Sequence, residues 1–299
     1  MDKETLYRNL NDGILAERLG AFRRNLGKNL EAIGRFGGLA RLLPEFRDRH
    51  VCVVGAGPSL DGCAGLLKKY QHRRELAIIA VDMALLPLVR SGVRPGYVIS
   101  CETLPVDFFG DVDTSDMHLL AFSCMSPVNL RRWRGDISFF NWMMQGPGYD
   151  ELWERAGRDL GAVATGNIVT TQAVAFALGC GIRSLMIIGN DLAFRRRYYA
   201  RGTVPHDAEH RRSNRFSPDV SAEMDSIRRR REYELHRGGI LYFTSHQFLA
   251  AKTWLEELLV RQATPVYECS DPGLAEKCVT KKGLRDYLSR FDRRSPGRR

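Results

Sequence analysis

The stretch VCVVGAGPSLD, residues 51–61, runs from apolar residues into two glycines, a proline and a serine. Glycines at the end of a strand let backbone N–H groups approach a phosphate or a sugar. The candidate nucleotide-binding residues in this turn are Gly55, Gly57, Pro58 and Ser59. A dinucleotide-binding turn would carry its third glycine at position 60, which is Leu60, so the spacing argues against a nicotinamide site. A plain strand-to-helix connection is the alternative.

Three acidic residues also follow apolar runs. Asp82 comes directly after LAIIAV, Glu102 comes directly after YVISC, and Asp191 closes SLMIIGND. A single acid at such a place often only caps a helix or forms a turn. Acids at successive strand ends favour hydrogen bonds to ribose or sugar hydroxyls, or a metal ion.

With the glycine turn, Asp82 and Glu102 as the first three candidates, the fourth is formed by Asp191 and the segment ATGN, which precedes the apolar helical pattern IVTTQAVAFALG. Thr165, Gly166 and Asn167 would lie at the N-terminus of that helix, where unpaired N–H groups and the helix dipole favour an anion. Capping alone would also explain these residue types. Because all four candidates follow predicted strands or precede a helix, we expect them to share one ligand site.

A long polar stretch, residues 195–239, interrupts the strand and helix pattern and predicts a basic lid. Its candidate residues are Arg195, Arg196, Arg197, Tyr198, Tyr199, His206 and His210. Arginine and tyrosine side chains can hold a phosphate leaving group, and a histidine can accept a proton from an attacking hydroxyl. We expect His206 to be this base, with His210 as the second choice. A basic loop without a ligand is the alternative.

The elements that would position these residues follow from the apolar pattern. Residues 1–48 carry helical spacing, and residues 49–289 alternate strand-like runs with helices such as LLKKY. The runs are HVCVVG, LAIIAV, YVISCE, HLLAFS, ISFFNW, SLMIIGND, ILYFTS and PVYECS. This alternation predicts an α/β, Rossmann-like domain with a mostly parallel sheet flanked by helices, a helical N-terminal lead-in and a basic tail at 290–299.

Composition narrows the class of protein. The 299 residues are 44% hydrophobic with a net charge of +10, and no apolar run approaches the roughly 20 residues of a membrane span. The N-terminus has no secretory signal pattern, so a cytoplasmic protein without a transmembrane segment is expected. The seven cysteines form no C-x-x-C pair, which argues for reduced thiols rather than zinc ligands. Basic residues without interleaved aromatics do not predict specific nucleic-acid binding.

Together, VVGAGPSLD, AVDMALLPLVRSGVRPGYVISCE, ATGNIVTTQAVAFALGC and LMIIGNDLAF resemble the central domain of the bacterial motility accessory factors. That family is also described as 6-hydroxymethylpterin diphosphokinase MptE-like. The resemblance runs from about Arg35 to FLAAKTWLEELL. The sequence departs from the family pattern at Asn167, where a serine is usual, and in the lid FRRRYYARG.

The resemblance implies a glycosyltransferase that moves a nonulosonic, sialic-acid-like sugar from a CMP donor, with flagellin or a glycan as candidate acceptor. Bacterial sialyltransferases have a similar core and work without a metal, using a histidine base and tyrosines on the departing phosphate. By this resemblance Gly55, Gly57, Pro58 and Ser59 would line the nucleotide, Asp82 and Glu102 the ribose or donor sugar, and Thr165, Gly166 and Asn167 the cytidine or phosphate. His206, Tyr198 and Tyr199 would be catalytic, and no cofactor would be required.

Two alternatives remain open. A diphosphokinase that transfers pyrophosphate from ATP to a pterin alcohol would need magnesium, and Asp82, Glu102 and Asp191 would then be metal ligands. A non-catalytic nucleotide or polyanion binder would use the lid arginines and need no base.

Overall fold

The computed structural model describes residues 3–211 and 233–292, and it places the side chains of all of these except residues 3–12 and 210. Within the described residues, nine parallel strands form one sheet in the order β11-β10-β7-β1-β2-β3-β4-β5-β6. They are β1 His50–Val54, β2 Leu76–Val81, β3 Tyr97–Ser100, β4 His118–Phe122, β5 Asp136–Trp142, β6 Ala162–Val163, β7 Ser184–Ile188, β10 Val266–Glu268 and β11 Thr280–Lys281. The predicted α/β, Rossmann-like fold is confirmed.

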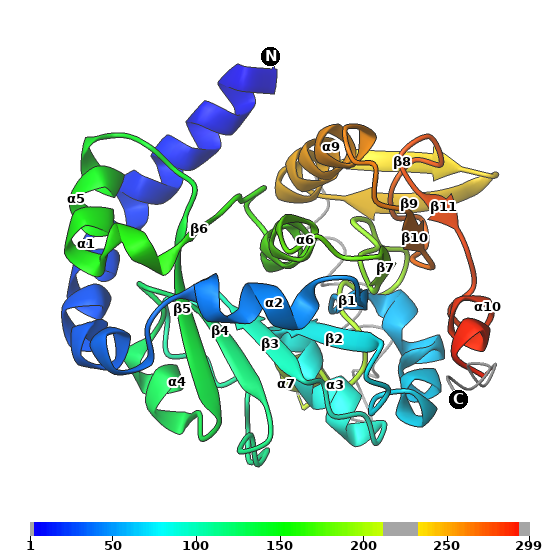
Figure 1. Ribbon diagram of the computed structural model, residues 1–299. Coiled ribbons are helices and arrows are strands. Elements are labelled where there is room, and N and C mark those ends of the chain that lie inside the picture. Colours follow the sequence, from blue (N-terminus) through cyan, green and yellow to red (C-terminus); the bar gives the residue numbers. More distant parts are fainter. Residues whose placement is uncertain (1–2, 212–232, 293–299) are drawn as a thin grey trace, which may run out of the picture.

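Helices cover both faces of the sheet. They are α1 Lys3–Phe36, α2 Leu43–Phe46, α3 Leu85–Arg90, α4 Pro127–Arg132, α5 Pro147–Ala156, α6 Val169–Gly179, α7 Val204–His210, α9 His246–Val260 and α10 Leu284–Leu288. The chain runs from β1 to β5 in one direction and then returns through α6 to β7, on the other side of β1. Since parallel crossovers are right-handed, α3 and α4 lie on one face and α6 on the other (Figure 1).

The strands are buried on both faces, which explains their continuous apolar runs. All six residues of β2 and all five of β7 are buried, because β2 and β7 lie inside the sheet and helices cover both of its faces. The apolar face of α2 packs on α6, where the rings of Phe46 and Phe176 meet edge to face at 5.1 Å. Within the described residues, no helix is both long enough and apolar enough to cross a bilayer.

Two elements differ from the sequence expectation. The run ILYFTS forms β9, Ile240–Thr244, which pairs antiparallel with β8, Tyr233–Arg237, in a separate two-stranded sheet. Gly238 and Gly239, both with positive φ, make the tight turn between these two strands, so their neighbour is local and not the main sheet. The segment LLKKY, predicted to be a helix, forms the end of the 3-10 helix Ala64–Lys69 and its C-cap Tyr70, in place of an α-helix.

The N-terminal helix α1 is fixed to the strand ends by buried polar contacts. Asn25 Nδ2 donates to the carbonyl oxygens of Thr103 and Cys124, which follow β3 and β4. One turn later, Asn29 Nδ2 donates to the carbonyl oxygens of two residues that follow β4. Phe22 packs edge to face on aromatic rings of β4 and β5. The helix therefore packs on the sheet with its C-terminal half, and its N-terminal part extends beyond the sheet (Figure 1).

Candidate ligand-binding site

A cavity of about 330 Å³ lies at the carboxyl ends of the strands. It is lined by the residues that follow β1, β2, β3 and β7, by the start of α6, by two lid tyrosines and by α1. β1 and β7 are neighbours in the sheet, and the strand order reverses between them, because the chain continues from β1 to β2 on one side and from β7 to β10 on the other. A crevice at such a reversal is where open α/β sheets bind ligands.

The glycine turn packs against the end of β7. A Cβ on Gly55 would lie 2.5 Å from the carbonyl oxygen of Gly189, and a Cβ on Gly57 would lie 2.2 Å from Oδ2 of Asp191. Both glycines are therefore required for this close backbone approach. Gly57 and Pro58 also line the cavity, whereas Gly55 and Ser59 are not among its lining residues.

Most N–H groups of this turn donate hydrogen bonds to acceptors within the protein. Gly57 N–H donates to Gly189 O at 2.8 Å, and Ser59 N–H donates to Oδ2 of Asp191 at 2.9 Å. The sequence suggested that these N–H groups would approach a phosphate, but the structure gives them acceptors on the segment after β7. The turn thus joins two strand ends and shapes one wall of the cavity.

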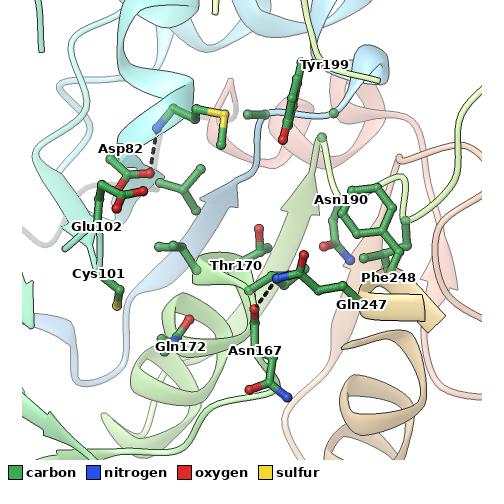
Figure 2. Close-up of a pocket in the computed structure, with 18 of the residues that line it drawn as sticks. Asp82, Cys101, Glu102, Asn167, Thr170, Gln172, Asn190, Tyr199, Gln247 and Phe248 are labelled. Atoms are coloured by element: carbon green, nitrogen blue, oxygen red, sulfur yellow. Dashed lines mark hydrogen bonds between the residues drawn. The ribbon is translucent and has the colours of Figure 1, made fainter. Parts of the chain in front are cut away.

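Asp82 and Glu102, which the sequence placed at successive strand ends, lie next to each other on one side of the cavity (Figure 2). Asp82 accepts hydrogen bonds from Ser100 Oγ at 2.7 Å and from the Met83 N–H at 2.8 Å. Burial, with a smaller contribution from the neighbouring charge of Glu102, raises the pKa of Asp82 to about 6, against these two hydrogen bonds. Glu102 Oε1 accepts from the Leu104 N–H at 2.7 Å. Two adjacent carboxylates of this kind suit the hydroxyl groups of a sugar.

Asp191 lines the cavity but also holds two loops together. Its Oδ2 accepts from the Ser59 N–H, and its Oδ1 accepts from the Asp271 N–H at 3.0 Å. Burial raises the pKa of Asp191 to about 6, against these hydrogen bonds. Within the described residues no three His, Cys, Asp or Glu side chains group as a metal site, so the trio Asp82, Glu102 and Asp191 is not one cluster.

The start of α6 faces the cavity. Thr165, Asn167, Val169 and Thr170 line it, and Ile168, the residue before the helix, gives no side-chain cap. The first N–H groups of a helix have no acceptor within the helix, so this end suits an anion. Gly166 is not among the lining residues; a Cβ there would lie 2.8 Å from the ring of Trp254. Asn167 takes a positive φ of 70°, which asparagine tolerates better than most residues.

Sequence reasoning missed several polar residues of the cavity. Gln172 is 2% exposed; its Nε2 donates to Thr165 Oγ1 at 2.7 Å, and its Oε1 has no hydrogen-bond partner. Asn190 and Gln247 lie on other parts of the wall (Figure 2). A glutamine within the apolar helix IVTTQAVAFALG, and an asparagine before Asp191, were signals that could have found two of these residues.

Of the lid candidates whose side chains the structure describes, only the tyrosines reach the cavity. Tyr198 and Tyr199 line it, and the Tyr198 ring stacks on Phe248 with centroids 4.9 Å apart. Arg195, Arg196 and Arg197 are not among the lining residues. Arg197 pairs with Asp61 at 2.6 Å, and the Arg195 guanidinium lies 5.9 Å from the Tyr242 ring. Arg195, Arg196 and Arg197 therefore do not supply the charge of this cavity.

The candidate base His206 lies in α7 and is not among the residues that line the cavity. Its Nδ1 is 3.4 Å from Oδ1 of Asp207. The side chain of the second choice, His210, lies outside the described part of the chain. The catalytic role of His206 stays a prediction.

Comparisons with known proteins agree with this fold. The MAf glycosyltransferase from Magnetospirillum magneticum AMB-1 is similar in structure, with a TM-score of 0.52 at 16% sequence identity. The likeness covers 97% of this chain and 50% of that protein, so the chain spans about half its length. No curated protein sequence matches the chain significantly. The model of one protein family matches residues 24–197, more than half of the chain, which shows that the chain belongs to the 6-hydroxymethylpterin diphosphokinase MptE-like family.

Proposed function

We propose that this protein is a transferase for a nucleotide-activated donor, and specifically a glycosyltransferase that uses a CMP-linked nonulosonic sugar. The observation that carries the proposal is one cavity that joins three kinds of group: adjacent carboxylates, the N-terminus of α6, and two lid tyrosines. These groups match the hydroxyls, the phosphate and the leaving group of a nucleotide sugar. The fold shared with a MAf glycosyltransferase supports this choice of reaction.

Each group has a distinct task in this proposal. Asp82 and Glu102 accept hydrogen bonds from ribose or sugar hydroxyls, and the N–H groups of Val169 and Thr170 face the phosphate. The unpaired Oε1 of Gln172 gains a donor from the ligand, because a buried acceptor without a partner is costly. Tyr198 and Tyr199 donate to the phosphate oxygens as negative charge develops there.

The proposed reaction is a displacement at the anomeric carbon. An acceptor hydroxyl oxygen forms the new bond to that carbon, the bond from carbon to phosphate oxygen breaks, and CMP leaves with the electron pair. The hydroxyl proton passes to a base, for which His206 is our candidate. A hydroxyl on a glycan or on a protein such as flagellin would serve as acceptor.

Ligand binding without a metal tests this function. We expect CMP and CDP to raise the melting temperature of the protein in EDTA, and AMP and ATP to raise it less. A ligand at about 100 times its dissociation constant stabilises the native state by roughly 2.7 kcal/mol, which is several degrees for a domain of this size. Equal shifts with all four nucleotides, or none, would contradict the cytidine donor.

Turnover tests the roles of individual residues. We expect Tyr199→Phe and His206→Ala to lower the release of CMP from CMP-N-acetylneuraminate by about 10²-fold or more, as expected for loss of a catalytic donor or base. Tyr233→Phe is the matched control, because Tyr233 lies in β8 and is 41% exposed. A His206→Ala variant with parental turnover would remove His206 from the mechanism.

The family match supports a second candidate, transfer of pyrophosphate from ATP to a pterin alcohol. In that reaction Asp82 and Glu102 are the pair that would hold magnesium together with the phosphates, since magnesium often uses only one or two carboxylates. Asp191 is less suited, because both its oxygens accept backbone N–H groups. A thermal shift with ATP that appears only with magnesium, together with no cytidine effect, would favour this candidate.

A further inference from the structure

The charges around the cavity are unevenly distributed. Three carboxylates line it, those of Asp82, Glu102 and Asp191, and Arg18 is the one cation among the described residues of its lining. Arg18 lies on α1 and precedes residues 24–197, the segment that matches the family. An anionic ligand in this cavity has to be balanced by positive charge, and Arg195, Arg196 and Arg197 do not line it.

Among the residues that the structure describes, the Arg18 guanidinium makes one hydrogen bond, from Nη1 to Thr103 Oγ1 at 3.5 Å, near the limit of such a bond. Within the described part of the chain, no carboxylate lies within 4 Å of it. A guanidinium carries five N–H donors, so most of them remain available to a ligand. Arg23, on the same helix, is paired with Glu151.

The fold holds Arg18 where it lies. Ile14 and Arg18 are one helical turn apart, and both line the cavity, so one face of α1 forms part of its wall. The hydrogen bonds of Asn25 and Asn29 fix the next two turns of α1 to the segments that follow β3 and β4. A preorganised arginine loses less side-chain freedom when it binds an oxyanion.

We propose that Arg18 binds the anionic group of the ligand and that the N-terminal helix α1 thereby completes the site. This inference rests on the proposed function for the identity of the ligand. The chemistry is that of a phosphate or a carboxylate, both of which a guanidinium binds in a bidentate fashion. In a CMP-linked nonulosonic sugar, the phosphate diester and the sugar carboxylate both carry such oxygens.

Binding measurements on charge variants test the inference. The variants are Arg18→Gln and Arg18→Lys, and Arg24→Gln is the matched control because Arg24 is exposed on the same helix. The probes are CMP, cytidine, pyrophosphate, N-acetylneuraminate and its methyl ester, measured by calorimetry. We expect Arg18→Gln to weaken the binding of the anionic probe by about 10- to 100-fold, as for loss of a charged hydrogen bond. Arg18→Lys should recover part of this loss, and Arg24→Gln should bind as the parent does.

The probes separate the two sources of charge. A loss for CMP without a loss for cytidine assigns Arg18 to the phosphate, and a loss for N-acetylneuraminate without one for its methyl ester assigns Arg18 to the carboxylate. Either result supports the inference. If the parent protein binds pyrophosphate through Arg18 but no nucleotide, the inference holds and the proposed function fails.

Two results would overturn the role of Arg18. The first is an Arg18→Gln variant that binds every probe with parental affinity. In that case the proposed function still stands if the parent protein binds the nucleotide. The second is a parent protein that binds none of the anionic probes. Melting temperatures of all variants, compared with Arg24→Gln, check that a loss of binding does not come from a loss of folding.

Discussion

Replacement of Asp82 by asparagine should stabilise the protein at neutral pH. Asp82 is 2% exposed, and its burial raises its pKa from 3.8 to about 6. Asparagine keeps an oxygen for the Met83 N–H, and its amide can donate to the Ser100 hydroxyl, which is free to rotate. The substitution therefore removes the cost of burying a charge and keeps both contacts.

The magnitude follows from the pKa values. A rise from 3.8 to about 6 corresponds to about 3 kcal/mol, because one pKa unit is 1.36 kcal/mol. The folded protein holds the Asp82 proton more tightly than the unfolded chain does. The carboxyl therefore does not lower the free energy of unfolding below pH 3.8, and the loss of stability reaches its full value as the pH rises through about 6. Asp82→Asn should therefore raise the free energy of unfolding by about 3 kcal/mol at pH 7.5 and by about half of that at pH 5.

Thermal unfolding of the variant and its parent at both pH values measures this effect. We expect the melting temperature of Asp82→Asn to exceed that of the parent by about 5 °C at pH 7.5, and by clearly less at pH 5. Asp111→Asn is the matched control, because Asp111 is exposed. A stabilisation that is the same at both pH values, or a destabilised variant at pH 7.5, would refute the argument that the ionised carboxylate is buried at a cost.

Two further substitutions test how the site is supported. Gly57→Ala should lower the free energy of unfolding by about 1–3 kcal/mol in urea denaturation, because its Cβ would lie 2.2 Å from Oδ2 of Asp191; Gly65→Ala, with no atom within 4 Å of the new Cβ, should be nearly neutral. Lys281→Met should lower the free energy of unfolding by about 3 kcal/mol at pH 7.5, because it removes the cation 2.6 Å from the fully buried Glu268. Burial already raises the pKa of Glu268, so protonation of Glu268 should reduce this loss of stability as the pH falls. Equal losses of stability at pH 5 and pH 7.5 would contradict this account.

Local sequence signals determined much of the architecture. Apolar runs that alternate with helical patterns predicted the parallel sheet, because strands buried on both faces are apolar along most of their length, as in β2 and in residues 185–188 of β7. The same reasoning placed Asp82 and Glu102 at neighbouring strand ends, since the carboxyl ends of parallel strands meet at one edge of the sheet. Tyr198 and Tyr199 were also found from their type and their place in the lid, and both line the cavity.

Tertiary structure decided which of these groups meet and which additional residues join them. The lid arginines looked like phosphate ligands in sequence, but Arg197 pairs with Asp61, a partner 136 residues away that no local pattern reveals. Arg18 lies outside every motif and reaches the cavity because Asn25 and Asn29 fix α1 to the segments after β3 and β4. Periodicity and turn chemistry act over a few residues, and sequence therefore determined the elements. The direction of a long polar side chain depends on contacts between distant segments, and only the packed structure set it.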